Sequence, residues 1–124
     1  MKRILIVDDE PTTRKLVSET LLREGYAVDV CQDGIDALVF LKENKPDLIL
    51  LDVMMPELTG YDVCHRIKFD PDLKHIPVII LTSRGQELDS RLGAMMGIEY
   101  LHKSSYPKEL LQQVRISLGE EKVR

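Results

Sequence analysis

The 124-residue sequence lacks several features that would place it in whole classes of protein. Its two cysteines, Cys31 and Cys64, form no CxxC pair, so we expect the reduced thiols of a cytosolic protein rather than a disulfide. No apolar run approaches the length of a membrane span, and the apolar residues between Arg3 and Asp8 are too few for a signal peptide. We therefore expect a soluble cytoplasmic protein.

An excess of basic residues is also absent. The formal net charge is -4, with charges of both signs mixed along the chain, which argues against a nucleic-acid-binding or membrane-binding surface. No GxGxxG motif follows the first predicted strand, and this disfavours a nucleotide-binding Rossmann domain. The three histidines are scattered and do not support a zinc site.

What the chain does contain is a regular alternation of strand and helix patterns. With 44% hydrophobic residues it suits one compact domain with one core. Apolar runs predict strands at residues 3–7, 27–31, 48–51, 78–81 and 100–102. Helical periodicity predicts helices at residues 11–24, 35–44, 61–69, 84–96 and 106–119. Because right-handed crossovers join such units, the alternation predicts a parallel α/β sheet covered on both faces.

Polar side chains follow the predicted strands where the strands end. Asp8 and Asp9 follow the first, Asp52 follows residues 48–51, and Thr82 and Lys103 follow the last two. In open parallel sheets, ligands bind outside the carboxyl ends of the strands. A single aspartate there could simply cap the next loop. Three carboxylates, a hydroxyl and an ammonium at one edge indicate a functional site instead.

The chemistry of this group favours a metal ion and a phosphoryl group. Carboxylates packed together repel one another, and a hard cation such as Mg²⁺, or Mn²⁺ in its place, relieves that repulsion. The ammonium of Lys103 and the hydroxyl of Thr82 then suit the oxygens of a phosphoryl group. A carboxylate can itself be the nucleophile that forms an acyl phosphate. The residues therefore point to a phosphoaspartate.

At these motifs the chain resembles the receiver domains of bacterial two-component response regulators, over essentially its whole length. The matching segments are VDDEP at 7–11, LDVMMP at 51–56, PVIILTS at 77–83, and Tyr100 placed three residues before Lys103. The resemblance implies a flavodoxin-like sheet of order 2-1-3-4-5 flanked by five helices. We expect the domain to span residues 1–119, with a loose polar tail at 120–124.

The resemblance also implies a role for each site residue. Asp52 would be the phosphoacceptor, receiving the phosphoryl group of a phosphohistidine from a sensor histidine kinase or a phosphotransfer protein. Asp9 would bind Mg²⁺ directly and Asp8 largely through water, with the backbone carbonyl of Met54 as a further ligand. Lys103 would pair with the phosphoryl oxygens.

The remaining implied roles concern the response to phosphorylation. Thr82 would move to hydrogen-bond the phosphoryl group, and Tyr100 would swing into the space left behind. That coupling would change the surface of the fourth helix, fifth strand and fifth helix, where a downstream effector protein or output domain reads the state. The resemblance is also compatible with a homodimer through the same face.

Two departures from the family pattern keep an alternative open. Ser104 and Ser105 follow Lys103, where the family usually has a proline and an aromatic residue. A cis Lys103–Ser104 peptide would cost about 2.5–4 kcal/mol, so we expect it to be trans, with Tyr106 taking the place of the aromatic residue. The loop at 97–100 is also one residue shorter than usual. A phosphate-independent interaction module therefore remains an alternative function.

An aspartate-nucleophile phosphatase is a second alternative. Such enzymes usually have a second carboxylate two residues beyond the nucleophile, and that position is Met54 here. We therefore expect a signalling domain that loses phosphate slowly, not an enzyme. We expect the side chains of Met54 and Met55 to fill the core, and Glu10 to support the acidic loop.

Overall fold

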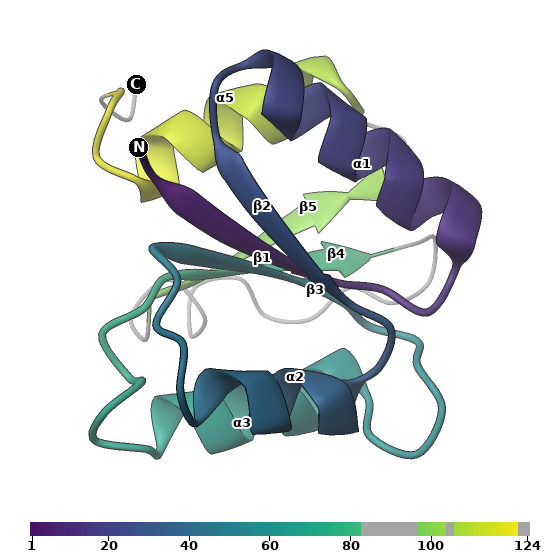
Figure 1. Ribbon diagram of the computed structural model, residues 1–124, viewed down its shortest axis with the longest axis vertical. Helices are drawn as coiled ribbons and strands as arrows, with labels where there is room; N and C mark the ends of the chain where they lie inside the picture. The colour runs from purple at the N-terminus through teal and green to yellow at the C-terminus, as the bar shows by residue number, and fades with distance from the viewer. Residues whose placement is uncertain (83–96, 104–105, 122–124) are drawn as a thin grey trace.

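The computed structural model describes residues 1–82, 97–103 and 106–121. Its centre is one parallel sheet with the strand order β2-β1-β3-β4-β5 (Figure 1). The strands are β1 (Arg3–Val7), β2 (Ala27–Cys31), β3 (Leu48–Asp52), β4 (Val78–Thr82) and β5 (Ile98–His102). The predicted flavodoxin-like sheet is confirmed. β5 begins at Ile98 rather than at Tyr100, because it pairs with β4 along its whole length.

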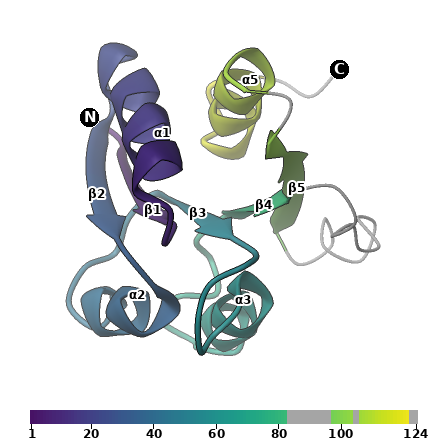
Figure 2. The ribbon, with the colours of Figure 1, turned by 90° about the vertical axis from the view of Figure 1, so that its right-hand side faces the viewer.

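Helices cover both faces of this sheet. They are α1 (Pro11–Arg23), α2 (Gly34–Leu41), α3 (Gly60–Lys68) and α5 (Lys108–Ser117). Figure 2 shows α1 and α5 on one face and α2 and α3 on the other. The predicted helix at 84–96 lies outside the described residues. None of the described helices has the length and hydrophobicity needed to cross a bilayer.

Two helix ends differ from the sequence-based prediction. α2 ends at Leu41 rather than near Asn44, because its last turn tightens: the amide of Lys42 donates to the carbonyl of Val39. α5 begins at Lys108, after a cis Tyr106–Pro107 peptide. The Lys103–Ser104 peptide, expected to be trans, involves a residue outside the described part of the chain.

The central strands are buried on both faces, as their unbroken apolar runs predict. Every residue of β3 and β4 is buried. Alternate side chains enter two cores: Leu5 packs with α2 and α3, whereas Ile4 packs with α1 and α5. At the edge of the sheet, β2 leaves Val30 50% exposed, as the mixed pattern of that strand predicts.

One prediction about the core is wrong. Met55 is buried, but the side chain of Met54 is 61% exposed. β3 ends at Asp52, so the strand alternation no longer dictates which side chains of the following loop face inward.

Gly60, the first residue of α3, lies directly against the end of β3. Its amide donates to the carbonyl of Val53 at 2.9 Å. A Cβ atom at Gly60 would overlap the carbonyl oxygen of Asp52 and lie 3.1 Å from the Cα of Val53. A capping box between Thr59 and Asp62 holds the helix start in this place. The backbone that carries Asp52 is therefore packed tightly against α3.

We predict that Gly60→Ala destabilises the protein by about 1–3 kcal/mol, because the added methyl group meets backbone atoms that cannot rotate away. Gly34→Ala is the matched control, since Gly34 also begins a buried helix turn but its Cβ would first meet a side-chain methyl of Val63. Urea denaturation should show the larger loss for Gly60→Ala. Equal losses in the two variants would contradict this account of the β3–α3 contact.

Candidate functional site

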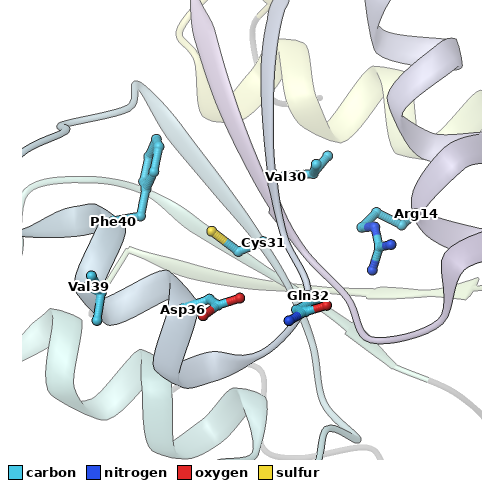
Figure 3. A pocket seen from close by; sticks show the side chains of 7 residues that line it. All are labelled: Arg14, Val30, Cys31, Gln32, Asp36, Val39 and Phe40. Carbon is cyan, nitrogen blue, oxygen red and sulfur yellow. The ribbon is translucent and has the colours of Figure 1, made fainter.

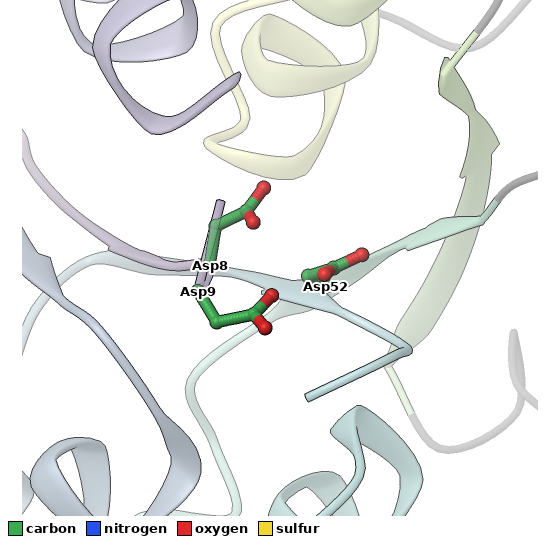
Figure 4. A group of neighbouring side chains, drawn as sticks. All are labelled: Asp8, Asp9 and Asp52. Atoms are coloured by element: carbon green, nitrogen blue, oxygen red, sulfur yellow. The ribbon is translucent and has the colours of Figure 1, made fainter. Parts of the chain in front are cut away.

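Three carboxylates meet where β1 and β3 end. One oxygen from each of Asp8, Asp9 and Asp52 lies within 4.8 Å of the others (Figure 4). The cause is the register of the sheet, in which Val7 pairs with Leu51, so the residues that come directly after this pair, Asp8 and Asp52, are neighbours. Asp8 and Asp52 are buried, whereas Asp9 is exposed. The structure thus brings together the three acids that the sequence places at strand ends.

Lys103 joins the cluster from the end of β5, the edge strand of the sheet. It follows β5, and its Nζ lies 2.7 Å from Oδ1 of Asp52 and 3.9 Å from Oδ2 of Asp8. The side chain of Asp52 is 5% exposed and that of Lys103 is 25% exposed. An ion pair with one buried partner is screened by solvent much less than a surface pair. Lys103 is therefore the direct counter-charge of Asp52.

The start of α1 holds the loop that carries Asp8. The amide of Glu10 donates to Oδ1 of Asp8 at 2.9 Å, and Nη1 of Arg14 donates to the carbonyl of Asp8 at 2.8 Å. Glu10 is also the N-cap of α1, accepting from the amides of Thr12 and Thr13. Glu10 therefore supports the acidic loop, as expected: its amide donates to Asp8, while its side chain caps α1.

Arg14 is a site-supporting residue that the sequence analysis missed. Its position in the first turns of α1, close after the acidic loop, was the only available signal. Beside it lies a groove between α1, the end of β2 and α2, lined among others by Val30, Asp36 and Phe40 (Figure 3). None of the predicted site residues lines this groove.

The environment of Asp8 disfavours the negatively charged form of its carboxyl group. Burial above all raises the pKa of Asp8 from 3.8 to about 6, and the charges of Asp52 and Asp9 add to that rise. The hydrogen bond from the amide of Glu10 and the charge of Lys103 lower the pKa and offset part of the shift. The cluster therefore has more negative charge than Lys103 alone compensates.

One oxygen of Asp8 points to the same conclusion. Oδ2 of Asp8 is buried, and no residue in the described part of the chain forms a hydrogen bond with it. A buried polar atom without a partner is costly, and a hard cation prefers carboxylate oxygens as ligands. The donor set of Asp8, Asp9 and Asp52 thus fits a divalent metal ion.

Thr82 and Tyr100 lie beside this cluster, on β4 and β5. Thr82 follows Leu81, the strand neighbour of Asp52, and its buried hydroxyl donates to the carbonyl of Leu101 at 3.5 Å. Tyr100 pairs with Ile80 and packs against the core on the α2 and α3 side. In the strand alternation Thr82 follows Ile80, which faces that same core. Thr82 and Tyr100 thus lie on the same face of the sheet.

The comparisons with known proteins agree with this geometry. The family model described as "Response regulator receiver domain" matches residues 4–115. The DNA-binding dual master transcriptional regulator RpaA of Synechocystis is 41% identical over 119 residues, which are 95% of this chain and 49% of that protein. The chain belongs to the response regulator receiver family.

Solved receiver structures share its fold. The signal receiver domain of a signal transduction histidine kinase from Syntrophus aciditrophicus has a TM-score of 0.86 and 34% identity, and the match covers 100% of this chain and 95% of that one. The response regulator TrrA of Thermotoga maritima, solved in complex with Mg²⁺-BeF, has a TM-score of 0.82 and 37% identity, over 94% of this receiver domain and 99% of that chain. The chain spans about half the length of the curated relatives it matches.

We predict a pH-dependent effect of Asp8→Asn in metal-free buffer. The folded protein binds the Asp8 proton more tightly than the unfolded chain does. Protonated Asp8 therefore favours the fold below about pH 4, and this contribution, at most about 3 kcal/mol, is lost as the pH rises to about 6. Asn keeps the neutral state at every pH, so the variant should gain stability relative to the wild type across this window.

Urea denaturation in EDTA at a series of pH values measures the difference. Asp72→Asn, which neutralises an exposed carboxylate far along the chain, is the control and should show a constant difference from the wild type. A constant difference for Asp8→Asn as well would show that burial does not hold a proton on Asp8.

Proposed function

We propose that this receiver domain, residues 1–119 with the short tail 120–124, is a phosphorylation-dependent signalling switch whose phosphoacceptor is Asp52. The observation that carries the proposal is the 2.7 Å pair between the Lys103 ammonium and a buried Asp52 carboxylate inside an acidic cluster. An ammonium in that position can also pair with the oxygens of a phosphoryl group on Asp52. Thr82 supplies a nearby hydroxyl as a further donor.

Asp8, Asp9, Asp52 and the backbone carbonyl of Met54 would hold Mg²⁺, with Mn²⁺ as a substitute. When bound, such an ion would neutralise the surplus charge of the carboxylates and of the incoming phosphoryl group. Two observations support this assignment. Oδ2 of buried Asp8 has no hydrogen-bond partner in the described part of the chain, and the relative TrrA was solved in complex with Mg²⁺-BeF.

The transfer needs little from the protein beyond positioning and charge. An oxygen of Asp52 bonds to phosphorus while the phosphorus–nitrogen bond of a donor phosphohistidine breaks, and the electron pair of that bond stays on the imidazole nitrogen. Lys103 stabilises the negative charge on the phosphoryl oxygens. At Met54 the chain has no carboxylate that could activate water, so hydrolysis of the acyl phosphate should be slow. The domain is therefore a switch and not a turnover enzyme.

Phosphorylation would shift a conformational equilibrium through Thr82 and Tyr100. Moving the Thr82 hydroxyl from the carbonyl of Leu101 to the phosphoryl group would exchange one hydrogen bond for a charge-assisted one. Tyr100, on the same face of the sheet, would then adopt an inward position. The surface of β5 and α5 would change with it, which is a population shift. The predicted fourth helix, which the resemblance implies as part of this surface, lies outside the described residues.

The partners follow from this function. The phosphodonor would be a cytoplasmic sensor histidine kinase or a phosphotransfer protein. The reader of the switch would be an effector protein or an output domain, and some relatives of about twice this length are named as DNA-binding regulators. A second copy of this domain, bound through the β5 and α5 face in a homodimer, would be another such partner.

A phosphate-independent interaction module is the second candidate. The observation in its favour is the replacement of the usual proline and aromatic residue by Ser104 and Ser105, next to Lys103. The retention of Asp8, Asp9 and Asp52 in one cluster favours the phosphorylated switch.

We predict that Mg²⁺ and acetyl phosphate add one acid-labile phosphoryl group to the protein, and that Asp52→Asn abolishes the addition. Intact-mass spectrometry measures both results. Asp72→Asn, an exposed carboxylate outside the cluster, should be labelled like the wild type. Labelling that persists in Asp52→Asn would refute the acceptor assignment, and an unlabelled wild type would favour the interaction module.

We also predict that Lys103→Ala keeps Mg²⁺ binding but uncouples the switch. Removing the ammonium leaves Asp52 without its counter-charge and should destabilise the metal-free protein by roughly 1–3 kcal/mol. Mg²⁺ should then raise the Tm of the variant at least as much as that of the wild type, because without Lys103 the carboxylate charge at the site is less compensated before the ion binds. Thermal unfolding with and without Mg²⁺ tests this. A lost Mg²⁺ response would show that Lys103 organises the metal site itself.

A further inference from the structure

Tyr106 places a phenol beside the acidic cluster, on the side opposite to Thr82. Its amide donates to the carbonyl of Lys103 at 3.4 Å, so the chain turns back immediately after the lysine. Its ring packs against the core formed with α1 and α5, which also contains Ile4 and Ile6 of β1. Asp8 continues that row of β1 by the strand alternation. The ring and the Asp8 carboxylate therefore lie on the same side of the sheet.

The polar end of this ring is buried and unsatisfied. The hydroxyl of Tyr106 and Oδ2 of Asp8 are both buried, and neither has a hydrogen-bond partner among residues 1–82, 97–103 and 106–121. Burial first, and then the negative charges of Asp8 and Asp52, raise the pKa of the Tyr106 phenol. Both carboxylates thus lie near enough to act on this hydroxyl.

A packing role alone does not explain this hydroxyl. A phenylalanine would fill the same space in the core without burying a polar atom that lacks a partner, and such an atom is costly. A tyrosine becomes favourable when something at the site forms a hydrogen bond with it. A hydrated Mg²⁺ ion brings such groups, because it keeps several of its water ligands when carboxylates bind it.

We propose that Tyr106 is a positioning residue of the metal site: its hydroxyl hydrogen-bonds the carboxylate of Asp8 through a water of the bound ion's hydration shell. The inference rests on the proposed function, since it needs the divalent cation that the acidic cluster would hold. Groups that hydrogen-bond to metal ligands orient them and strengthen binding. One molecule of water would thereby give a hydrogen bond to both the Tyr106 hydroxyl and Oδ2 of Asp8.

The test is Tyr106→Phe, which removes one oxygen and keeps the ring. We expect its Mg²⁺ affinity to fall by about three- to tenfold, the loss of one hydrogen bond. We expect its metal-free stability to equal or exceed that of the wild type, because a buried unsatisfied hydroxyl is gone. Isothermal titration with Mg²⁺ alone, without phosphodonor, measures the affinity, and urea denaturation in EDTA measures the stability.

Tyr26→Phe is the matched control. Tyr26 precedes β2 at the opposite edge of the sheet, and its hydroxyl donates to Oε1 of Glu120 at 2.7 Å. The control should lose stability, because a formed hydrogen bond is removed, and should bind Mg²⁺ like the wild type. The two stability changes thus distinguish the Tyr26 hydroxyl, which is already hydrogen-bonded, from the Tyr106 hydroxyl, which would gain its partner only with the ion.

The outcomes distinguish this inference from the proposed function. If the wild type binds Mg²⁺ and accepts phosphate while Tyr106→Phe binds Mg²⁺ equally well, the role of Tyr106 is refuted and the switch stands. Lower metal-free stability of Tyr106→Phe with unchanged Mg²⁺ affinity would also refute it, since the hydroxyl would then be structural. A wild type that binds no Mg²⁺ would overturn both.

Discussion

The interaction on which the rest of the molecule depends is the burial of carboxylate charge at the ends of two apolar strands. Asp8 and Asp52 are both buried, and only one ammonium, that of Lys103, approaches them within 4.0 Å in the described part of the chain. Removing such charges from water is costly unless an opposite charge or a hydrogen bond compensates. The raised pKa of Asp8 shows that compensation is incomplete. A divalent cation bound by these carboxylates would complete it.

The scaffold makes this arrangement rigid by holding the strand ends with helix starts. Glu10 caps α1 and at the same time donates its amide to Asp8. Gly60 begins α3 against the backbone of Asp52, at a distance that only a residue without a Cβ atom allows. Catalytic and binding groups on such supported strand ends lose little entropy when a ligand arrives. The apolar core on both faces of the sheet thus serves the geometry of the site.

The residues of the candidate site lie on both faces of the sheet. Asp8 continues a row of β1 that faces α1 and α5, where Tyr106 also packs. Thr82 and Tyr100 belong to the row that faces α2 and α3. In the proposed switch, Asp8 and the residues that would respond to phosphorylation therefore face different cores.

Much of the site could be predicted from the sequence because strand ends are local signals. Unbroken apolar runs predict β3 and β4, and parallel strands bring whatever follows them to one edge. Asp8, Asp9, Asp52 and Lys103 meet there as expected. The strand order came from the family resemblance, since composition and periodicity do not determine which strands are neighbours.

The tertiary structure alone decided what depends on contacts between distant segments. The strand pattern places Asp8 and Asp9 at the same strand end and does not indicate which is buried. In the structure Asp8 is buried and Asp9 is exposed. The sequence pattern places Met54 in the core and gives Arg14 no role at the site. In the folded chain Met54 is exposed, and Nη1 of Arg14 donates to the carbonyl of Asp8. Periodicity reports which side of its own element a residue occupies. Burial, charge compensation and the unsatisfied hydroxyl of Tyr106 depend on what other elements pack there, and only the folded chain decides that.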